Sequence, residues 1–370
     1  MTPRDVVVVG GSTAGTTTVR ELRRLGFDGR VVLVDPVDGT HRPPLSKGVL
    51  SGDDPTTARI AHDDLDAEVL RATATGLDPG RRRLRTDAGT LGYDALVVAT
   101  GSHARRLVAD ARAGEHVLRT LEDALRLRER LASSEHVVVV GAGFLGLEAA
   151  SAAVRAGARV TVVDPEPPLL RLLGAHLADV LVERCVESGI ALVRSGARLL
   201  GDPVDAVLLD DATRLPADLV VTCVGDVPAT QWLATAGGDA PGGLPIDAAA
   251  RTAWDGVLAA GDAAAPPGPG GHRRTPYWAS AAAQGRVAAA TILGVPPEHD
   301  VVDPYHWTEV AGTSLKVVGP LPVDGPPDHV VEGDGPARQV VAWSGPTVAA
   351  VGLRRPLPRL RRLAADLASL

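Results

Sequence analysis

Residues 136–146, HVVVVGAGFLG, decide the fold of this chain. The valine run predicts a buried strand, and Gly141, Gly143 and Gly146 follow it with the spacing GxGxxG. Glycines at this spacing permit a tight turn into a helix and let backbone amides approach a pyrophosphate at the positive end of that helix. About 20 residues beyond the loop, a second strand ends at Asp164, whose carboxylate suits the hydroxyls of an adenosine ribose. Together these features predict a Rossmann-type unit that binds a dinucleotide, rather than a chance glycine-rich turn.

The residues around Asp164 bear on the choice of nicotinamide cofactor. A carboxylate at this position accepts hydrogen bonds from the ribose hydroxyls and repels a 2′-phosphate. The next residues, Pro165, Glu166 and Pro167, add no arginine that would hold such a phosphate. This unit is therefore predicted to prefer NADH to NADPH.

The same design occurs earlier, in residues 5–15, DVVVVGGSTAG, followed by a helix and a strand that ends at Asp35. Ser12 stands where the second glycine is expected. A serine side chain is small, and Gly10 and Gly15 keep the turn and the helix packing, so the loop is still predicted to accept a pyrophosphate. These residues alone leave open which dinucleotide binds here, or whether the unit is empty and kept for structure.

Length and composition fit a folded chain of more than one domain. The 370 residues exceed the usual size of a single core, and 45% hydrophobic with 22% charged residues is typical of globular proteins. A net charge of −7 disfavours a general nucleic-acid surface. No apolar run approaches the roughly 20 residues of a membrane span, and a first strand at Asp5 leaves no room for a signal peptide.

Two cysteines, Cys185 and Cys223, lie far apart and have no histidine cluster beside them. This spacing forms neither a CxxC redox motif nor a zinc motif, so no metal site is predicted. A reduced, cytoplasmic setting follows from the same observation.

The chain is predicted to have an α/β fold, with two Rossmann-type domains and a small C-terminal α+β domain. The strand and turn YDALVVATGS (93–102) would close the first unit, and DLVVTCVG (218–225) would close the second. A glycine- and proline-rich link at 241–245 would lead back to the first domain. The predicted domains are residues 1–108 with 240–300, residues 109–239, and residues 301–370.

Further segments resemble the FAD-dependent ferredoxin reductases that serve bacterial oxygenases, the putidaredoxin reductase-like family. They appear in the family's order and span nearly the whole chain. They are HRPPLSKGVL (41–50), YDALVVATGS (93–102), the second glycine loop with FLGLE (144–148), VLAAGD (257–262), WASAAAQG (278–285) and YHWTE (305–309). The resemblance implies a glutathione reductase-like architecture, FAD in the first unit, NADH in the second, a C-terminal domain over the flavin, and a transient ferredoxin-type iron–sulfur partner.

The resemblance also implies two catalytic residues. Lys47 resembles the family lysine beside flavin N5, where a cation stabilises negative charge as the ring accepts a hydride. Glu148 resembles a family glutamate that orients NADH and pairs with Lys47. Without the resemblance, Lys47 would be read as a surface lysine and Glu148 as a carboxylate at a helix N-terminus.

The remaining site residues follow from the same match. Asp262 is expected to accept the ribityl hydroxyls of FAD, although an aspartate here can also cap a turn. Trp278 is expected on a helix that starts at Thr275-Pro276, with its amides near flavin N1 and the C2 carbonyl. Arg42 is expected to reach the FAD phosphates or the ring edge. The predicted FAD site is Gly10, Ser12, Ala14, Gly15, Asp35, Arg42, Lys47, Thr100, Gly101, Asp262 and Trp278, and the predicted NADH site is Gly141, Gly143, Gly146 and Asp164.

Several departures from the family pattern bear on the electron acceptor. The stretch 52–75 is shorter than usual for the family, the C-terminal domain is compact, and His306 stands where an aromatic ring is common. Two alternatives stay open: an NADH oxidase or biosynthetic flavoenzyme with oxygen or a small molecule as acceptor, and a flavin-binding interaction protein that lost turnover. Disulfide reduction is disfavoured because the two cysteines form no pair beside the flavin.

Ferredoxins are generally acidic, so a partner surface should carry positive charge. The candidates are the arginines near the C-terminus: Arg354, Arg355, Arg359, Arg361 and Arg362. The alternative is that they only solubilise a terminal helix.

Overall fold

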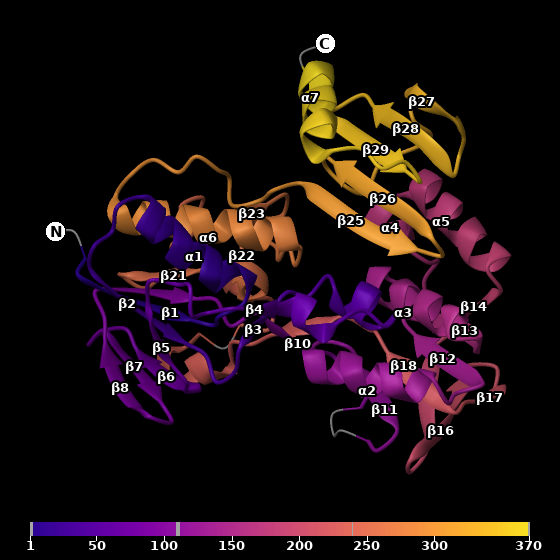
Figure 1. Cartoon of the computed structure of the whole chain (residues 1–370), viewed down its shortest axis with the longest axis horizontal. Coiled ribbons are helices and arrows are strands. Elements are labelled where there is room, and N and C mark those ends of the chain that lie inside the picture. The colour runs from indigo at the N-terminus through magenta and orange to yellow at the C-terminus, as the bar shows by residue number, and fades with distance from the viewer. Residues whose placement is uncertain (1–2, 109–111, 239, 369–370) are drawn as a thin grey trace. The chain divides into compact units, whose positions relative to one another are not determined.

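The computed structural model describes residues 3–108, 112–238 and 240–368 (Figure 1). The chain divides into two compact units. Unit 1 comprises Met1–Arg42, Ala58–His103 and Asp226–Asp303, and unit 2 comprises Pro43–Thr57, Ala104–Gly225 and Pro304–Leu370. The predicted domain limits at 109 and 239 lie outside the described residues, and the predicted three-domain division stays a prediction.

Unit 1 is built on a parallel sheet with the strand order β21-β9-β1-β2-β5. Its strands are β1 (Asp5–Val9), β2 (Arg30–Val34), β5 (Glu68–Leu70), β9 (Ala95–Val98) and β21 (Val257–Ala259). Their valine-rich runs are buried, as expected for a parallel sheet covered on both faces. Helices α1 (Thr13–Arg24) and α6 (Trp278–Leu293) pack closely, because Gly285 lies where a Cβ would be 2.6 Å from the carbonyl oxygen of Ala14 (Figure 1).

Shorter elements complete unit 1. An antiparallel sheet of β6, β7 and β8 contributes Leu77 and Leu84 to the same core. The short elements are β3 (Gly39–Thr40), β4 (Arg59–Ile60), β6 (Ala74–Asp78), β7 (Arg83–Thr86), β8 (Gly89–Gly92), β19 (Asp226–Pro228), η3 (Gln231–Ala236), β20 (Leu244–Pro245), η4 (Gly261–Ala263), β22 (Ala264–Ala265), β23 (Pro267–Gly268) and β24 (Gly271–His272). Strand β10 (Ser102–Ala104) lies where the chain passes into unit 2.

Unit 2 contains a second parallel sheet, with the strand order β11-β18-β12-β13-β14. Its strands are β11 (Glu115–Val117), β12 (His136–Val140), β13 (Arg159–Asp164), β14 (Ile190–Arg194) and β18 (Leu219–Thr222). Its helices are α2 (Leu121–Leu131), α3 (Phe144–Arg155), α4 (Leu170–Leu173) and α5 (Ala175–Glu187). A reciprocal cap between Thr120 and Asp123 starts α2. An antiparallel ribbon joins β15 (Ala197–Gly201), β16 (Val204–Leu209) and β17 (Arg214–Pro216).

Unit 2 also contains an antiparallel sheet with the order β25-β26-β29-β28-β27, against which α7 (Leu357–Ala368) packs. Its strands are β25 (Tyr305–Val310), β26 (Thr313–Val318), β27 (His329–Gly335), β28 (Arg338–Trp343) and β29 (Thr347–Val351). Helix α3 contacts both β25 and the π-helical turn η1 (Leu45–Val49), also in unit 2. Both elements therefore place side chains beside α3.

The predicted fold class is confirmed: each parallel sheet carries one of the two glycine loops, and the C-terminal residues form an α+β layer. One helix start was predicted wrongly. The helix that carries Trp278 does not begin at Thr275-Pro276, because Tyr277 has an extended backbone (φ −119°, ψ 145°) and its amide bonds the Thr275 carbonyl at 2.7 Å. None of the helices in the described residues has the length and apolar character needed to cross a membrane.

Candidate functional site

The first glycine loop joins β1 to α1 in unit 1. Gly10 has φ +106°, and a Cβ there would lie 2.3 Å from the carbonyl oxygen of Ala99. At Gly15 a Cβ would lie 1.8 Å from the carbonyl oxygen of Gly10. Only glycine allows these approaches of strand, turn and helix. The turn therefore directs the N-terminus of α1 outward from the end of the sheet, where it can meet a phosphate.

The second loop, between β12 and α3 in unit 2, has the same geometry. Gly141 has φ +107°, and a Cβ at Gly146 would lie 1.9 Å from the carbonyl oxygen of Gly141. Around Gly143 the space is open, because an added Cβ would meet only the Leu172 side chain, at 3.8 Å. Gly143 (φ −77°, ψ −175°) and Ser12 in the first loop (φ −88°, ψ −159°) have nearly the same extended backbone. The serine thus preserves the backbone conformation of the loop, and both loops fit a pyrophosphate.

The acidic residues at the strand ends are held alike in the two units. In unit 1 the Gly11 amide donates to one oxygen of Asp35, and the amide two residues beyond Asp35 donates to the other at 3.0 Å. In unit 2 the Ala142 amide donates to Asp164 at 2.7 Å, and the amide two residues beyond Asp164 donates at 2.8 Å. Each carboxylate is fixed beside its loop and keeps acceptor capacity for ribose hydroxyls.

Several predicted FAD-site residues converge on the first loop. The Thr100 amide lies next to Gly10, where a Cβ would be 3.0 Å from its nitrogen. A Cβ at Gly261, the residue before Asp262, would lie 3.1 Å from the Ala14 Cβ. This brings the Asp262 turn against α1, in the region where the first loop opens.

Hydrogen bonds to neighbouring residues fix these turns. Gly101 has φ +70°, and its carbonyl accepts the Ala229 amide at 2.9 Å. The Ser102 hydroxyl donates to Asp262 at 3.3 Å. The fully buried Gln284 accepts the amide of Gly261 at 2.7 Å, which holds the turn that carries Asp262.

Trp278 and Arg42 are two further predicted members of the FAD site. Trp278 is the first residue of α6 and is 50% exposed. Arg42 is half-buried after β3. Their roles stay predictions.

Glu148 contacts three polar side chains within unit 2, Lys47, Thr308 and Ser46, which together form the Glu148 cluster. It lies on α3 and is 5% exposed. The Lys47 Nζ lies 2.8 Å from Oε1, and the Thr308 hydroxyl donates to the same oxygen at 2.6 Å. The Ser46 hydroxyl donates to Oε2. A buried carboxylate is tolerated when it is paired and hydrogen-bonded, and these three donors meet that requirement.

Lys47 has a second partner, because its Nζ lies 4.6 Å from the centroid of the Trp307 ring. A cation over an aromatic face at this distance is attracted by the ring quadrupole. Lys47 is also one of only two lysines, with Lys316, among 38 basic residues. The chain uses arginine almost everywhere else and keeps a compact ammonium at this position.

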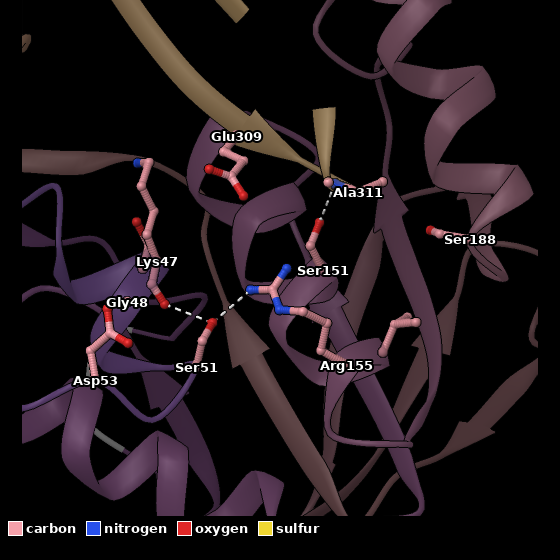
Figure 2. Close-up of a pocket in the computed structure, with 12 residues that line it drawn as sticks. Lys47, Gly48, Ser51, Asp53, Ser151, Arg155, Ser188, Glu309 and Ala311 are labelled. Carbon is pink, nitrogen blue, oxygen red and sulfur yellow. Dashed lines mark hydrogen bonds between the residues drawn. The ribbon is translucent and has the colours of Figure 1, made fainter. Parts of the chain in front are cut away.

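The segment that carries Lys47 is tied to the helices of unit 2 by two arginines. Arg128, on α2, donates to two backbone carbonyls of the segment at 3.2 and 3.3 Å. Arg155, at the end of α3, donates to the Ser51 hydroxyl at 2.8 Å, and that hydroxyl donates to the Lys47 carbonyl at 2.9 Å. Figure 2 shows Ser51 between Arg155 and the Lys47 backbone. The backbone of the segment that carries Lys47 is thus held by both α2 and α3.

A pocket of about 530 Å³ opens beside this segment (Figure 2). The lining residues are Ser46, Lys47, Gly48, Ser51, Asp53, Ser151, Val154, Arg155, Ser188, Glu309, Ala311 and Gly312. Two cations face two carboxylates across these walls, so the pocket has no net charge that would select an anion or a cation.

The two cysteines are free and lie in unit 2. Burial raises the pKa of the Cys185 thiol to about 11. Burial, with a smaller effect of the nearby Glu148 carboxylate, raises the pKa of the Cys223 thiol to about 12. Both thiols stay protonated at neutral pH and are poor nucleophiles, which disfavours a disulfide reductase.

Three residues in or beside the Glu148 cluster were not predicted from sequence: Ser46, Trp307 and Thr308. They lie in the quoted segments RPPLSKG and YHWTE. The contacts of Ser46 and Thr308 with Glu148 had no sequence signal, because these residues are 102 and 160 residues away from it. Trp307 contacts Lys47 instead.

Comparison with known proteins gives a consistent result. Residues 4–285 match the family model described as pyridine nucleotide-disulphide oxidoreductase. The chain is 33% identical over 354 residues to the biphenyl dioxygenase system ferredoxin–NAD(+) reductase component of Paraburkholderia xenovorans (strain LB400), covering 91% of this chain and 85% of that protein. It is 32% identical over 340 residues to putidaredoxin reductase CamA of Pseudomonas putida, covering 85% and 80% of the two chains.

Solved structures agree with these relatives. The covalent putidaredoxin reductase–putidaredoxin complex contains a chain that superposes with a TM-score of 0.85 and 29% identity, covering 98% of this chain and 93% of that chain. The fold similarity thus extends through both units and the C-terminal sheet.

Proposed function

The chain belongs to the pyridine nucleotide-disulphide oxidoreductase family, and on this basis we propose that it carries electrons from NADH through FAD to a ferredoxin-type iron–sulfur protein that serves an oxygenase. It is an FAD-dependent NADH oxidoreductase. The observation that carries the proposal is the pair of equivalent glycine loops, each with its own clamped aspartate, Asp35 or Asp164. The acceptor class is supported by the relatives, which are a ferredoxin–NAD(+) reductase component and a putidaredoxin reductase.

Each cofactor is assigned to one loop. FAD binds at the first loop, with the pyrophosphate at the N-terminus of α1 and the adenosine ribose at Asp35. NADH binds at the second loop, with its ribose at Asp164. The corresponding domains are residues 1–108 with 240–300 for FAD, 109–239 for NADH, and 301–370 for the C-terminal layer.

The catalytic roles belong to the Glu148 cluster. Bound FAD supplies the ability to accept a hydride and to release electrons singly, which nicotinamide lacks. Lys47 supplies a positive charge that stabilises negative charge at the acceptor ring. Glu148 holds that ammonium in place and orients the nicotinamide. Ser46 and Thr308 keep the Glu148 carboxylate fixed by hydrogen bonds.

A cytoplasmic location is part of the proposal. The free cysteines support it, since proteins of oxidising compartments usually pair theirs.

Anaerobic mixing tests the electron path. The protein is expected to bleach its flavin on mixing with NADH and to recover its colour on addition of an oxygenase-type ferredoxin. Separate addition of oxygen tests the main rival. Fast oxygen consumption, together with failure of every ferredoxin tried, would favour an NADH oxidase.

The first prediction concerns the nicotinamide cofactor. Reduction of bound FAD by NADH is expected to be at least about ten-fold more efficient than by NADPH, because the Asp164 carboxylate repels a 2′-phosphate. Stopped-flow reduction with each cofactor measures the ratio. Asp164→Asn should lower it, whereas Asp211→Asn, which removes an exposed carboxylate in the same unit, should leave it unchanged. Equal use of both cofactors by the unaltered protein would show that Asp164 does not select the ribose.

The structure refines the predicted arginine patch. Arg354 is exposed. Arg355 is half-buried and forms an ion pair with Glu332, and Arg359 lies 3.4 Å from the same carboxylate. Reversing the charge of Arg355 would disturb an internal pair, so Arg354 is the cleaner position to test.

Arg354→Glu is expected to slow ferredoxin reduction several-fold, up to about ten-fold at low salt, because steering of an acidic partner weakens. The effect should shrink as salt rises, and flavin reduction by NADH should not change. Arg198→Glu, an equal charge change on β15, is the control. A salt-independent effect, or none at low salt, would remove Arg354 from the partner surface.

A further inference from the structure

His62 is a buried histidine beside the first glycine loop, in the stretch that departs in length from the predicted family. It follows β4, which pairs with β3, and is 3% exposed. Its Nε2 lies 2.8 Å from the carbonyl oxygen of Gly11. The ring fills the space beside two glycines, because a Cβ at Gly11 would lie 2.7 Å from Nε2 and one at Gly39 would lie 2.8 Å from it.

The surroundings of the ring select one tautomer. Two lone pairs facing each other at 2.8 Å would repel, so Nε2 carries the proton and donates it to Gly11. The Gly39 amide, 3.3 Å from Nε2, then has no acceptor there. In this tautomer Nδ1 is a lone pair, and that buried atom has no hydrogen-bond partner among the described residues.

The unpartnered Nδ1 indicates that His62 is not explained by packing alone. A buried polar atom without a partner costs stability, and an apolar side chain of similar size would fill the same space without that cost. An apolar side chain could not replace the hydrogen bond that Nε2 donates to the Gly11 carbonyl.

The hydrogen bond from His62 to the Gly11 carbonyl sets the direction of the Ser12 amide. The peptide between Gly11 and Ser12 is planar and trans, so its N–H points opposite to its carbonyl. With the carbonyl turned toward His62, the Ser12 amide points away from the ring, at the N-terminus of α1. The preceding peptide is fixed as well, because the Gly11 amide donates to Asp35.

Among the residues that the structure describes, no histidine forms a hydrogen bond with the corresponding residue of the second loop. Ala142, in the place of Gly11, donates its amide to Asp164 in the same way. The extra clamp thus belongs to the loop in which Ser12 replaces a glycine, and glycine is the residue that lets the backbone approach a pyrophosphate most closely.

We propose that His62 is a positioning residue of the FAD site, holding the Gly11 peptide so that the Ser12 amide faces the cofactor pyrophosphate. This rests on the proposed binding of FAD at the first loop. His62 contacts the backbone of the first loop, so its effect is expected in the affinity for FAD.

The test compares two substitutions of equal length. In His62→Gln the side-chain amide nitrogen stands near the position of Nε2 and can donate, whereas His62→Met has similar size and no donor. FAD affinity is measured by titrating FAD into apoprotein and following quenching of flavin fluorescence. The Met variant is expected to bind FAD about ten-fold more weakly, since it leaves the buried Gly11 carbonyl without a partner, and the Gln variant should stay within about three-fold of the unaltered protein.

Other measurements separate positioning from general damage. NADH affinity should be unchanged in both variants. His272→Met is the matched control, because this exposed histidine of the same unit also contacts a backbone carbonyl, that of Ala265 at 3.0 Å. If the Met variant does not fold, His62→Asn replaces it, because its shorter amide cannot reach Gly11 and should weaken FAD binding equally.

Two results would contradict the proposal or its premise. Gln and Met variants that lose equal affinity, or a Met or Asn variant that binds FAD normally, would overturn the role of His62 and leave the proposed function standing. Failure of the unaltered apoprotein to bind FAD would instead overturn the proposed function.

Discussion

Replacing Lys47 by methionine is expected to slow the reduction of bound FAD by NADH by about a hundred-fold, the usual effect of removing one preorganised charge from a reacting centre. The Lys47 ammonium lies 2.8 Å from Glu148 and 4.6 Å from the Trp307 ring centroid, so its position is fixed before any substrate binds. Anaerobic stopped-flow absorbance of the flavin measures the rate, and saturation with NADH separates it from binding.

Loss of stability is the competing explanation for a slow Lys47→Met variant. Removing the lysine leaves Glu148 buried without its cation, which costs about 3–5 kcal/mol in typical buried pairs. The double variant Lys47→Met with Glu148→Gln removes both charges and should recover most of the stability but not the rate. Lys316→Met is the control, because it deletes the only other lysine, whose Nζ bonds the Arg355 carbonyl at 3.1 Å. A double variant that reduces FAD at the normal rate would rule out a charge effect of Lys47.

Local sequence predicted the parts of the fold that depend on near neighbours. The valine runs and glycine spacing predict both strand–turn–helix units because each turn is closed by contacts within a few residues, such as Gly146 against the Gly141 carbonyl. The aspartates at the second strand ends were predicted from the fixed spacing of this motif, although the amides that bond them lie 24 and 22 residues away. The start of α6 was missed, because a proline at position 276 permits a helix but does not require one, and Tyr277 is extended.

Contacts between distant segments were beyond the reach of sequence patterns. Glu148 receives Ser46 and Thr308 from segments 102 and 160 residues away, and only the packing of η1 and β25 on α3 brings them together. His62 likewise reaches Gly11 across 51 residues. The family resemblance supplied Lys47 and Glu148 as a pair, but neither their hydroxyl partners nor the aromatic ring beside the lysine.

Gly146→Ala is expected to weaken NADH binding strongly and lower stability, whereas Gly143→Ser should be tolerated. A Cβ at Gly146 would lie 1.9 Å from the Gly141 carbonyl oxygen, so strand and helix must separate, at a cost of about 1–3 kcal/mol or more. At Gly143 the nearest atom to an added Cβ is 3.8 Å away, and Ser12 shows that the equivalent loop accepts a serine with the same backbone.

The two substitutions therefore separate the two roles of glycine in one loop. NADH affinity measured by titration should fall at least about a hundred-fold for Gly146→Ala, a loss of roughly 2.7 kcal/mol, and no more than several-fold for Gly143→Ser. FAD content should be normal in both variants, because the first loop is untouched. If Gly143→Ser lost as much NADH affinity as Gly146→Ala, the second loop would require a closer pyrophosphate approach than the first, and the equivalence of the two loops would fail.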